Sequence, residues 1–365
     1  MKLSCITTIY NEGALLQESL TSLLAQTYED FEIIVVNDGA SEASRQALEE
    51  FSDPRIRVIR QANDGLSSAR NRAIEHVKGD YVCFLDADDQ RPDWTFRTIV
   101  NQIEQHQPDL ILCTGLYVGH RGRAQPFFDQ RYFDQLALIV PSDVVSREDE
   151  QWNEAMFYSL LTEPQSANKF IRTGLLNDSS IRFPNGQVFE DIFFHSSIIA
   201  ASNKIAYQHN PGFLYYHRYQ HQQLTGQGQE TRFDLLATVK MTLEAFALSP
   251  GFQDPKQRTA LVLAAMRIIR WSNDITAHSL KYAFRQAATG LFQLIDPKYL
   301  ELVPHPLSED DDIRNLTTFT KSLMNSNATG ADKDHSITPP NLNGIPHEQP
   351  RKASLLHRLW PGARS

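Results

Sequence analysis

Strand-like and helical stretches alternate along the first part of the chain, and this pattern most constrains the fold. The strand-like runs are Leu3 to Ile9, Phe31 to Val36, Arg57 to Ile59 and Tyr81 to Leu85. Between them lie stretches with apolar residues at helical spacing, such as Leu15 to Leu24 and Leu66 to Val77. This alternation indicates β-α-β units and therefore an α/β fold with a mostly parallel sheet flanked by helices.

Acidic residues follow two of these strand-like runs. Asp38 comes after Phe31 to Val36, and the stretch Asp86 to Asp89 comes after Tyr81 to Leu85. Open α/β sheets bind ligands at the carboxyl ends of their strands, so both groups are expected at one ligand-binding edge. Gathered carboxylates repel one another and lose hydration, and Mg²⁺ or Mn²⁺ would compensate their charge. The alternative for Asp86 to Asp89 is a plain acidic turn after a core strand.

Four elements, in order and spacing, resemble the nucleotide-sugar half of family 2 glycosyltransferases. This family has the GT-A fold, which is related to the Rossmann architecture. The elements are Thr8 to Glu12, Ile34 to Gly39, Asn63 to Asn71 and Phe84 to Asp89. Weaker matches continue through Asn168 to Phe170, Phe189 to Asp191 and Tyr215 to Arg218. Thr8 departs from the family pattern, which usually has proline there; this alters local backbone stiffness but removes no catalytic group.

The resemblance implies a site for a nucleotide-sugar donor. Its residues would be Thr8, Tyr10, Glu12, Asp38, Asp64, Arg70, Asp86, Ala87 and Arg218. Asp38 would accept a hydrogen bond from uracil N3–H and Tyr10 would stack on the base; the alternatives are a turn-capping Asp and an ordinary half-buried aromatic. Arg70 would neutralise the diphosphate, form an ion pair with Asp86 or Asp88, or do both. Asp86 would hold ribose or sugar hydroxyls.

The resemblance also implies a divalent metal, Mn²⁺ or Mg²⁺, bound by Asp88. The metal would stabilise the negative charge on the leaving diphosphate. His217 is a second candidate ligand, with a hydrogen-bonded structural histidine as the alternative.

Asp191 is the candidate general base, which would accept the proton of the attacking acceptor hydroxyl. Glu190 would orient Asp191 or contact an acceptor hydroxyl. The alternative is that both acids only stabilise the start of a helix. Family members carry out a single displacement, which inverts the anomeric configuration.

We therefore expect an inverting glycosyltransferase that moves a sugar, most simply from a UDP-sugar, to a glycan or lipid-linked acceptor in cell-surface polysaccharide synthesis. One rival is a nucleotidyltransferase with an acidic metal site, which would need a basic, glycine-rich triphosphate loop that the sequence lacks. The other is a non-catalytic nucleotide-sugar binding protein, which would not need Asp191.

Composition bears on partners and location. The formal net charge of -9 argues against a nucleic-acid surface, which is normally basic. We find no apolar run of about 20 residues, the length that a membrane span needs. Cys5, Cys83 and Cys113 lie in apolar segments and are expected to be buried free thiols in a reducing cytoplasm. These features favour a cytoplasmic protein, with peripheral contact at the inner face of the cell membrane as an option.

The expected domain organisation is a GT-A domain followed by helices and a tail. The GT-A domain covers 1–230, with a nucleotide-sugar half (1–115) and an acceptor half (116–230). A helical region follows at 231–324, then a disordered linker at 325–350 whose polar composition would not support a core. The basic tail 351–365 resembles a short interfacial helix that contacts anionic lipid weakly; an ordinary tail and a partner-binding peptide are the alternatives.

Overall fold

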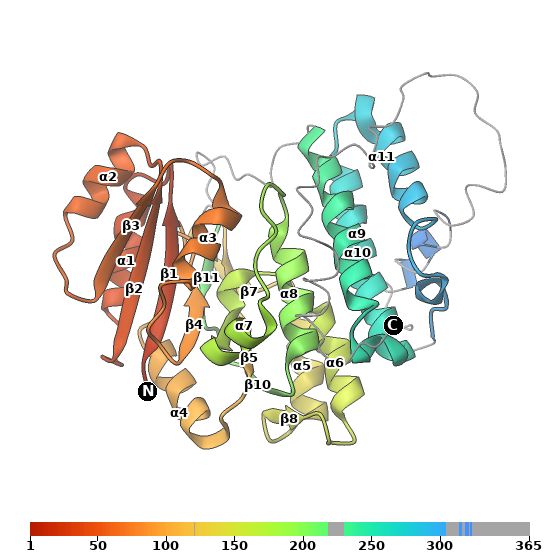
Figure 1. Cartoon of the computed structure of the whole chain (residues 1–365), viewed down its shortest axis with the longest axis horizontal. Helices are drawn as coiled ribbons and strands as arrows, with labels where there is room; N and C mark the ends of the chain where they lie inside the picture. The colour runs from red at the N-terminus through yellow and green to blue at the C-terminus, as the bar shows by residue number, and fades with distance from the viewer. Residues whose placement is uncertain (120, 218–229, 304–313, 316–317, 321, 323–365) are drawn as a thin grey trace. The chain divides into compact units, whose positions relative to one another are not determined.

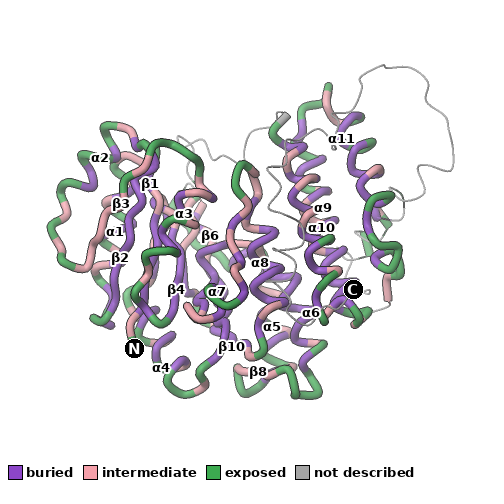
Figure 2. Tube along the Cα trace, viewed as in Figure 1, coloured by how far each residue is buried: buried purple, intermediate pink, exposed green. Residues whose placement is uncertain are grey.

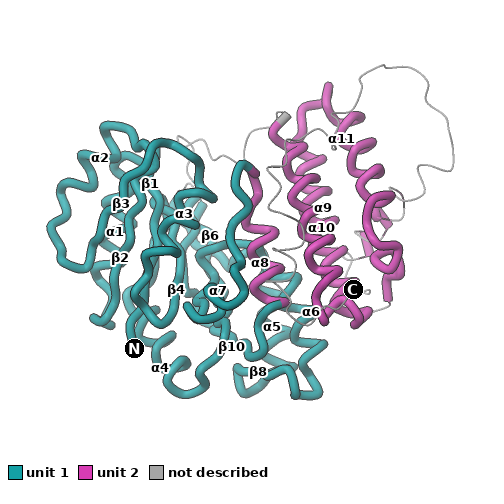
Figure 3. Tube along the Cα trace, in the orientation of Figure 1, with its two compact units in different colours: residues 1–186, 201–222 teal, residues 187–200, 223–365 magenta. Residues whose placement is uncertain are grey.

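The computed structural model describes residues 1–119, 121–217, 230–303, 314–315, 318–320 and 322 (Figure 1). The expectations for Arg218, for the linker 325–350 and for the tail 351–365 fall outside these residues. The chain forms two compact units (Figure 3). The first consists of residues 1–186 and 201–222, and the second of residues 187–200 and 223–365.

An eight-stranded sheet in the order β3-β2-β1-β4-β9-β5-β10-β8 forms the centre of the first unit. Its strands are β1 (Leu3–Ile9), β2 (Phe31–Asp38), β3 (Ile56–Gln61), β4 (Tyr81–Phe84), β5 (Leu110–Cys113), β8 (Val144–Ser146), β9 (Lys169–Arg172) and β10 (Lys204–Gln208). The strands β3, β2, β1 and β4 pair in parallel, as their alternation with helices predicts. β9 runs antiparallel between β4 and β5, and β8 is an antiparallel edge strand. The α/β fold class expected from the sequence is confirmed.

Seven helices connect and cover these strands. They are α1 (Leu15–Leu24), α2 (Glu42–Glu49), α3 (Leu66–Ile74), α4 (Thr95–His106), α5 (Gln130–Ile139), α6 (Trp152–Leu161) and α7 (Thr173–Ser179). Alternate residues of a strand point to opposite faces of the sheet. One face of β1, β2 and β4 packs with apolar residues of α1, α2 and α4 in a single core cluster. The other face is buried as well, so that β1, β2 and β4 are drawn almost entirely as buried in Figure 2, whereas buried and exposed residues alternate along α1.

A small second sheet, in the order β11-β6-β7, also belongs to the first unit. Its strands are β6 (Leu116–Val118), β7 (Ala124–Pro126) and β11 (Leu214–Tyr216). β11 pairs in parallel with β6 and is attached to the residue that follows the acidic turn, because Gln90 and Leu214 exchange backbone hydrogen bonds of 3.2 and 2.8 Å. This sheet therefore fixes the segment before Arg218 next to the end of β4.

The second unit is helical. Its described helices include α8 (Glu190–Ala201), α9 (Asp234–Phe246), α10 (Pro255–Ile275) and α11 (His278–Leu291). Asp254 caps α10, accepting hydrogen bonds from the backbone N–H groups of Lys256 and Gln257, and Pro255 suits the first helical position. Buried residues of α9 recur at helical spacing, at Leu235, Leu236, Val239 and Leu243, so its stability comes from one packed face.

The three cysteines, Cys5, Cys83 and Cys113, are buried free thiols, as expected. Burial raises the pKa of the Cys113 thiol to about 12. Within the described part of the chain, the helices lack the combination of length and apolar character that crossing a bilayer requires.

Candidate functional site

Three neighbouring parallel strands end together at one edge of the large sheet. β1 lies between β2 and β4, and all three run in the same direction. Asp38 is the last residue of β2, Tyr10 directly follows β1, and Asp86 follows β4 by two positions. The structure thus brings together three of the residues proposed to bind the nucleotide sugar.

Asp38 is a structural anchor at this edge. It is 5% exposed, and its carboxylate accepts three hydrogen bonds. Gln61 Nε2 and the backbone N–H of Asp64 donate to Oδ1, both at 2.8 Å, and the backbone N–H of Gly65 donates to Oδ2 at 3.0 Å. The carboxylate therefore fixes the loop that enters α3. The sequence pattern did not reveal this role, because the partners lie 23 to 27 residues away in the chain.

The turn after Asp38 needs glycine. Gly39 has φ of +68°, a left-handed conformation that residues with a Cβ rarely adopt. A Cβ on Gly39 would lie 3.0 Å from the backbone nitrogen of Asn63. The turn after β2 and the loop before α3 consequently pack directly against each other.

Arg70 and Asp86 form an ion pair, which is one of the two roles considered for Arg70. Nη2 of Arg70 lies 2.7 Å from Oδ1 of Asp86. The Arg70 side chain is 3% exposed and the Asp86 side chain 33% exposed. The Arg70 guanidinium also lies over the ring of Phe183, 5.0 Å from its centroid. Asp86 is thus held from the protein side while it remains accessible to solvent.

The residues of the acidic turn alternate in exposure. Asp86 and Asp88 are partly exposed, while Ala87 and Asp89 are buried. The two partly exposed carboxylates are the ones proposed to bind the sugar and the metal. Asp89 has a different role, because its Oδ1 accepts a hydrogen bond from the backbone N–H of Tyr216 at 2.9 Å. This contact spans 127 residues, so no local signal could have indicated it.

His217 follows β11 and is exposed. Its ring stacks on that of Tyr117, with centroids 6.1 Å apart and planes at 29°, and its backbone N–H donates to the carbonyl of Val118 at 2.9 Å. β11 brings His217 to the side of the sheet where Asp89 lies. Its role as a metal ligand stays a prediction.

The segment after β1 is ordered by local hydrogen bonds. Glu12 accepts a hydrogen bond from the backbone N–H of Tyr10 at 2.7 Å, and the carbonyl of Tyr10 accepts one from the N–H of Ser41 at 2.7 Å. The Tyr10 side chain, 44% exposed, is accessible for stacking on a flat ligand. Thr8 is partly buried within β1, opposite Val36.

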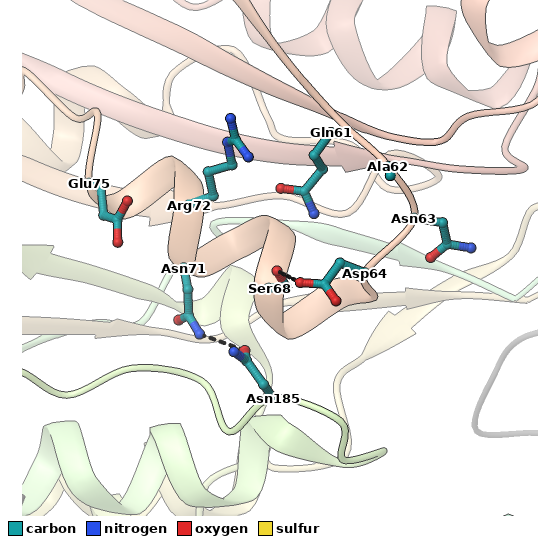
Figure 4. Close-up of a pocket in the computed structure, with 9 residues that line it drawn as sticks. All are labelled: Gln61, Ala62, Asn63, Asp64, Ser68, Asn71, Arg72, Glu75 and Asn185. Atoms are coloured by element: carbon teal, nitrogen blue, oxygen red, sulfur yellow. Dashed lines mark hydrogen bonds between the residues drawn. The ribbon is translucent and has the colours of Figure 1, made fainter. Parts of the chain in front are cut away.

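A groove of about 540 Å³ lies beside α3 (Figure 4). It is lined by Gln61, Ala62, Asn63, Asp64, Ser68, Asn71, Arg72, Glu75 and Asn185. Among the lining residues, Asp64 accepts a hydrogen bond from the Ser68 hydroxyl, and Asn71 donates one to Asn185 Oδ1 at 3.1 Å. All of these lining residues except Ala62 have polar side chains, which suits a hydrated or hydroxyl-rich ligand.

Asn71 links α3 to the segment that precedes α8. Its Nδ2 donates to the carbonyl of Phe183 at 2.7 Å, and its Oδ1 accepts from the Phe183 N–H at 2.9 Å. These bonds join residues 112 positions apart and were not foreseen from the sequence.

Glu190 and Asp191 occupy the first turn of α8, in the second unit. Glu190 is 6% exposed, and Asp191 is partly exposed. The amino end of a helix favours a negative charge, so this position supports the ionised carboxylate that a general base requires, as well as simple stabilisation of the helix. Asp191 as the base stays a prediction.

The donor set at the acidic turn suits Mg²⁺ or Mn²⁺ bound together with a ligand. Among the residues that the structure describes, no group of three or more His, Cys, Asp or Glu side chains is placed to hold a metal. Mg²⁺, however, usually binds through one or two carboxylates completed by water and substrate phosphate oxygens. The partly exposed carboxylate of Asp88 fits that requirement, while Asp86 is paired with Arg70.

Comparison with known proteins adds independent information. Residues 4–154 match the model of the family described as Glycosyl transferase family 2. The uncharacterized glycosyltransferase EpsJ of Bacillus subtilis (strain 168) is 44% identical over 116 residues, 31% of this chain and 33% of EpsJ. Glycosyltransferase GlyA of Streptococcus pneumoniae serotype 4 is 30% identical over 217 residues, 59% of this chain and 30% of GlyA. The chain thus spans about a third of the length of these two relatives.

A solved structure has a similar fold. Residues 1–349 of S. aureus TarS, crystallised in complex with UDP-GlcNAc, superpose with a TM-score of 0.65 at 20% identity. The match covers 89% of this chain and 92% of that one. At this level of identity, the likeness establishes the shared GT-A fold.

Proposed function

We propose that this chain, whose residues 4–154 belong to glycosyl transferase family 2, transfers a sugar from a nucleotide-diphosphate sugar to a hydroxyl group of a glycan or lipid-linked acceptor. The observation that carries the proposal is the shared edge of β1, β2 and β4, where Tyr10, Asp38 and Asp86 lie at the carboxyl ends of adjacent strands. We further propose cell-surface polysaccharide as the product, in keeping with the glycosyltransferase relatives.

The donor in this proposal is a UDP-sugar. A carboxylate offers about four lone-pair positions, and the hydrogen bonds from Gln61, Asp64 and Gly65 occupy three of those on Asp38. The remaining position, on Oδ2, would accept uracil N3–H. Tyr10, whose side chain is 44% exposed, would stack on the base. TarS was crystallised with UDP-GlcNAc, which makes that compound the first donor to try.

The sugar and diphosphate would be held at the acidic turn. Asp86, oriented by Arg70 at 2.7 Å, would accept hydrogen bonds from ribose or sugar hydroxyls. Asp88 would bind Mn²⁺ or Mg²⁺, and His217 is a further candidate ligand. When bound, the cation would stabilise the charge that develops on the leaving diphosphate. Asp64, Arg70 and Arg218 are proposed to face the nucleotide.

Asp191 would complete the reaction as general base. It would take the proton from the acceptor hydroxyl as that oxygen attacks the anomeric carbon. The diphosphate would leave from the opposite side, so that the anomeric configuration inverts. Glu190 would orient Asp191 or contact the acceptor.

The substitution Asp191→Asn tests the transferase assignment against a binding-only protein. We expect it to retain UDP affinity within about two-fold while turnover of UDP-GlcNAc falls by about 10²–10⁴-fold, the usual contribution of a general base. The matched control is Glu42→Gln, which removes an exposed acid from the first turn of α2. It should leave turnover unchanged. Normal turnover in Asp191→Asn would reject the assigned base, and pyrophosphate release from a nucleoside triphosphate would favour a nucleotidyltransferase.

A further inference from the structure

The turn directly before Glu190 and Asp191 contains an unusual backbone conformation. Phe189 has φ of +69°. Among the described residues, the other non-glycine residues with positive φ are Gln107, Asp143 and Ser180, so Phe189 alone of this set has an aromatic side chain. A bulky residue in this region is a true outlier, and it persists only where its surroundings hold it there. Such outliers concentrate at functional sites.

Two side chains of the helical region hold the ring of Phe189. The ring lies edge-to-face against Trp271 of α10, with centroids 6.2 Å apart and planes at 84°. The guanidinium of Arg232 lies 5.6 Å from the Phe189 centroid and 4.7 Å from the Trp271 centroid. Arg232 is 1% exposed, so its guanidinium is shielded from water where it makes cation–π contacts with the two rings. We call these three residues the Phe189 clamp.

Hydrogen bonds attach the same turn to α8 and α9. The hydroxyl of Thr238, in α9, donates to the carbonyl of Val188 at 3.3 Å. The carbonyl of Phe189 accepts a bond from the N–H of Ile192 at 3.2 Å, which closes the first turn of α8. The backbone of Phe189 is therefore part of the start of α8, where Asp191 lies in the first turn.

Trp271 is not packed as an ordinary core residue. It is 43% exposed, whereas residues that serve only a hydrophobic core are usually buried. Its aromatic and cation contacts are directed at Phe189 and Arg232, within the same compact unit.

We propose that the Phe189 clamp positions Asp191 for catalysis, and that this gives the C-terminal helical region a part in the transfer reaction. Phe189, Arg232 and Trp271 act through the first turn of α8 and are positioning residues. The inference rests on the proposed function, because it assumes that Asp191 is the general base.

The test compares Trp271→Leu with the conservative Trp271→Phe in the full chain. Tyr282→Leu is the matched control, because Tyr282 is an aromatic residue of α11 in the same unit and is 49% exposed. The readouts are kcat and KM for UDP-GlcNAc turnover, the pH dependence of kcat, and amide hydrogen exchange of residues 187–192.

We expect Trp271→Leu to lower kcat by about 10–100-fold, because a misplacement of about 1 Å can cost about 10²-fold. The KM for UDP-GlcNAc should change by less than about two-fold, since the proposed donor-binding residues Asp38 and Asp86 belong to the first unit. The acidic limb of the kcat profile should move, and exchange at 187–192 should accelerate. Trp271→Phe and Tyr282→Leu should resemble the wild type.

A second pair of variants separates backbone positioning from ring contact with a ligand. Phe189→Gly can keep positive φ without strain, whereas Phe189→Ala cannot. Positioning predicts a larger loss of kcat in Phe189→Ala than in Phe189→Gly. Equal losses would overturn the role of the backbone conformation.

The remaining outcomes distinguish this inference from the proposed function. If Asp191→Asn abolishes turnover but Trp271→Leu preserves kcat, the clamp is rejected and the proposed function stands. If kcat, KM and the melting temperature all deteriorate together in Trp271→Leu, the clamp is only structural and the inference fails. If the wild type does not turn over UDP-GlcNAc, the proposed function fails for this donor. In that case the clamp is still tested by hydrogen exchange: if exchange at residues 187–192 is the same in Trp271→Leu as in the wild type, the clamp is rejected.

Discussion

Replacing Asp38 with Asn should loosen the loop that leads into α3 and destabilise the first unit. Asp38 accepts hydrogen bonds from three donors: Gln61 Nε2, and the backbone N–H groups of Asp64 and Gly65. An Asn side chain has only one acceptor oxygen. If that oxygen takes the Oδ1 position, its NH₂ group faces the N–H of Gly65, where the present distance is 3.0 Å. In the reverse orientation the NH₂ group faces the N–H of Asp64, at 2.8 Å.

The expected cost follows from these bonds. At least one charge-assisted hydrogen bond is lost, which is worth about 1.5–3 kcal/mol when the acceptor is charged. We take about 2 kcal/mol because Asp64 and Gly65 are exposed and water can partly replace their partner. For a unit of this size, such a loss lowers the melting temperature by about 4–8 °C.

Calorimetric unfolding of Asp38→Asn beside Asp64→Asn provides the assay. Asp64 lies in the same loop, but it is exposed and its carboxylate accepts a bond from the Ser68 hydroxyl. The control should change the unfolding free energy by less than about 0.5 kcal/mol, as is usual for a surface site. UDP affinity should also fall in Asp38→Asn. If the two variants unfold alike, within about 0.5 kcal/mol of the wild type, the account of Asp38 as anchor is refuted.

Three further predictions concern other parts of the molecule. In denaturant unfolding, Gly39→Ala should lower the free energy of unfolding more than Gly122→Ala does. Both glycines have positive φ (+68° and +70°), but of the two only Gly39 would place a Cβ against backbone, 3.0 Å from the nitrogen of Asn63. Equal losses would contradict the close packing of the turn after β2 against the loop before α3. Asp88→Ala should bind UDP more weakly than the wild type in the presence of Mn²⁺, but as tightly as the wild type after chelation. If calorimetry finds that the variant and the wild type have the same affinity for UDP with Mn²⁺ as well, Asp88 is rejected as a metal ligand. Burial raises the pKa values of Tyr81 and Tyr158 to about 12, so the folded chain retains these phenol protons above pH 10 while the unfolded chain releases them. The free energy of unfolding should therefore be unaffected by these groups below about pH 10 and fall between about pH 10 and 12. An absorbance titration in which both tyrosines of the folded protein ionise near pH 10 would contradict the prediction.

Local patterns predicted the features of the fold that depend on neighbouring residues. The alternation of strands and helices predicted the parallel arrangement of β1, β2, β3 and β4, since each strand and its connecting helix form one local unit. The same reasoning predicted that Asp38 and Asp86 follow strands that end at one edge. The ion pair between Arg70 and Asp86 was one of two readings of Arg70, and the structure contains it.

Other features depend on contacts between distant parts of the chain, which a local pattern does not encode. β9 is a strand of four residues, Lys169–Arg172, inserted antiparallel between β4 and β5, and so short a segment carries no local signal for its place in the sheet. The helix α4 begins at Thr95 and not at Pro92, although proline suits the first position of a helix. Instead, the carbonyl of Pro92 accepts the N–H of Thr95 in a turn before the helix. The anchoring of β11 by Asp89 likewise depends on a residue 127 positions away.

The assignment of Phe189 required the backbone itself. In the sequence, Phe189 is one apolar residue before a pair of acids, and phenylalanine as a residue type does not indicate a left-handed backbone conformation. The residues that hold it, Arg232 and Trp271, lie in the region 231–324, for which the sequence predicted only helices. Positioning roles of this kind arise from tertiary contacts and become visible only in the folded chain.

The central claim is that the edge formed by β1, β2 and β4 binds a nucleotide-sugar donor. Calorimetric titration of the folded protein with UDP, GDP, CDP and TDP, with Mn²⁺ and after chelation, tests this claim most directly. The account predicts that UDP binds most tightly and that Mn²⁺ strengthens its binding. Failure of every nucleotide to bind to protein shown to be folded, with and without Mn²⁺, would contradict it.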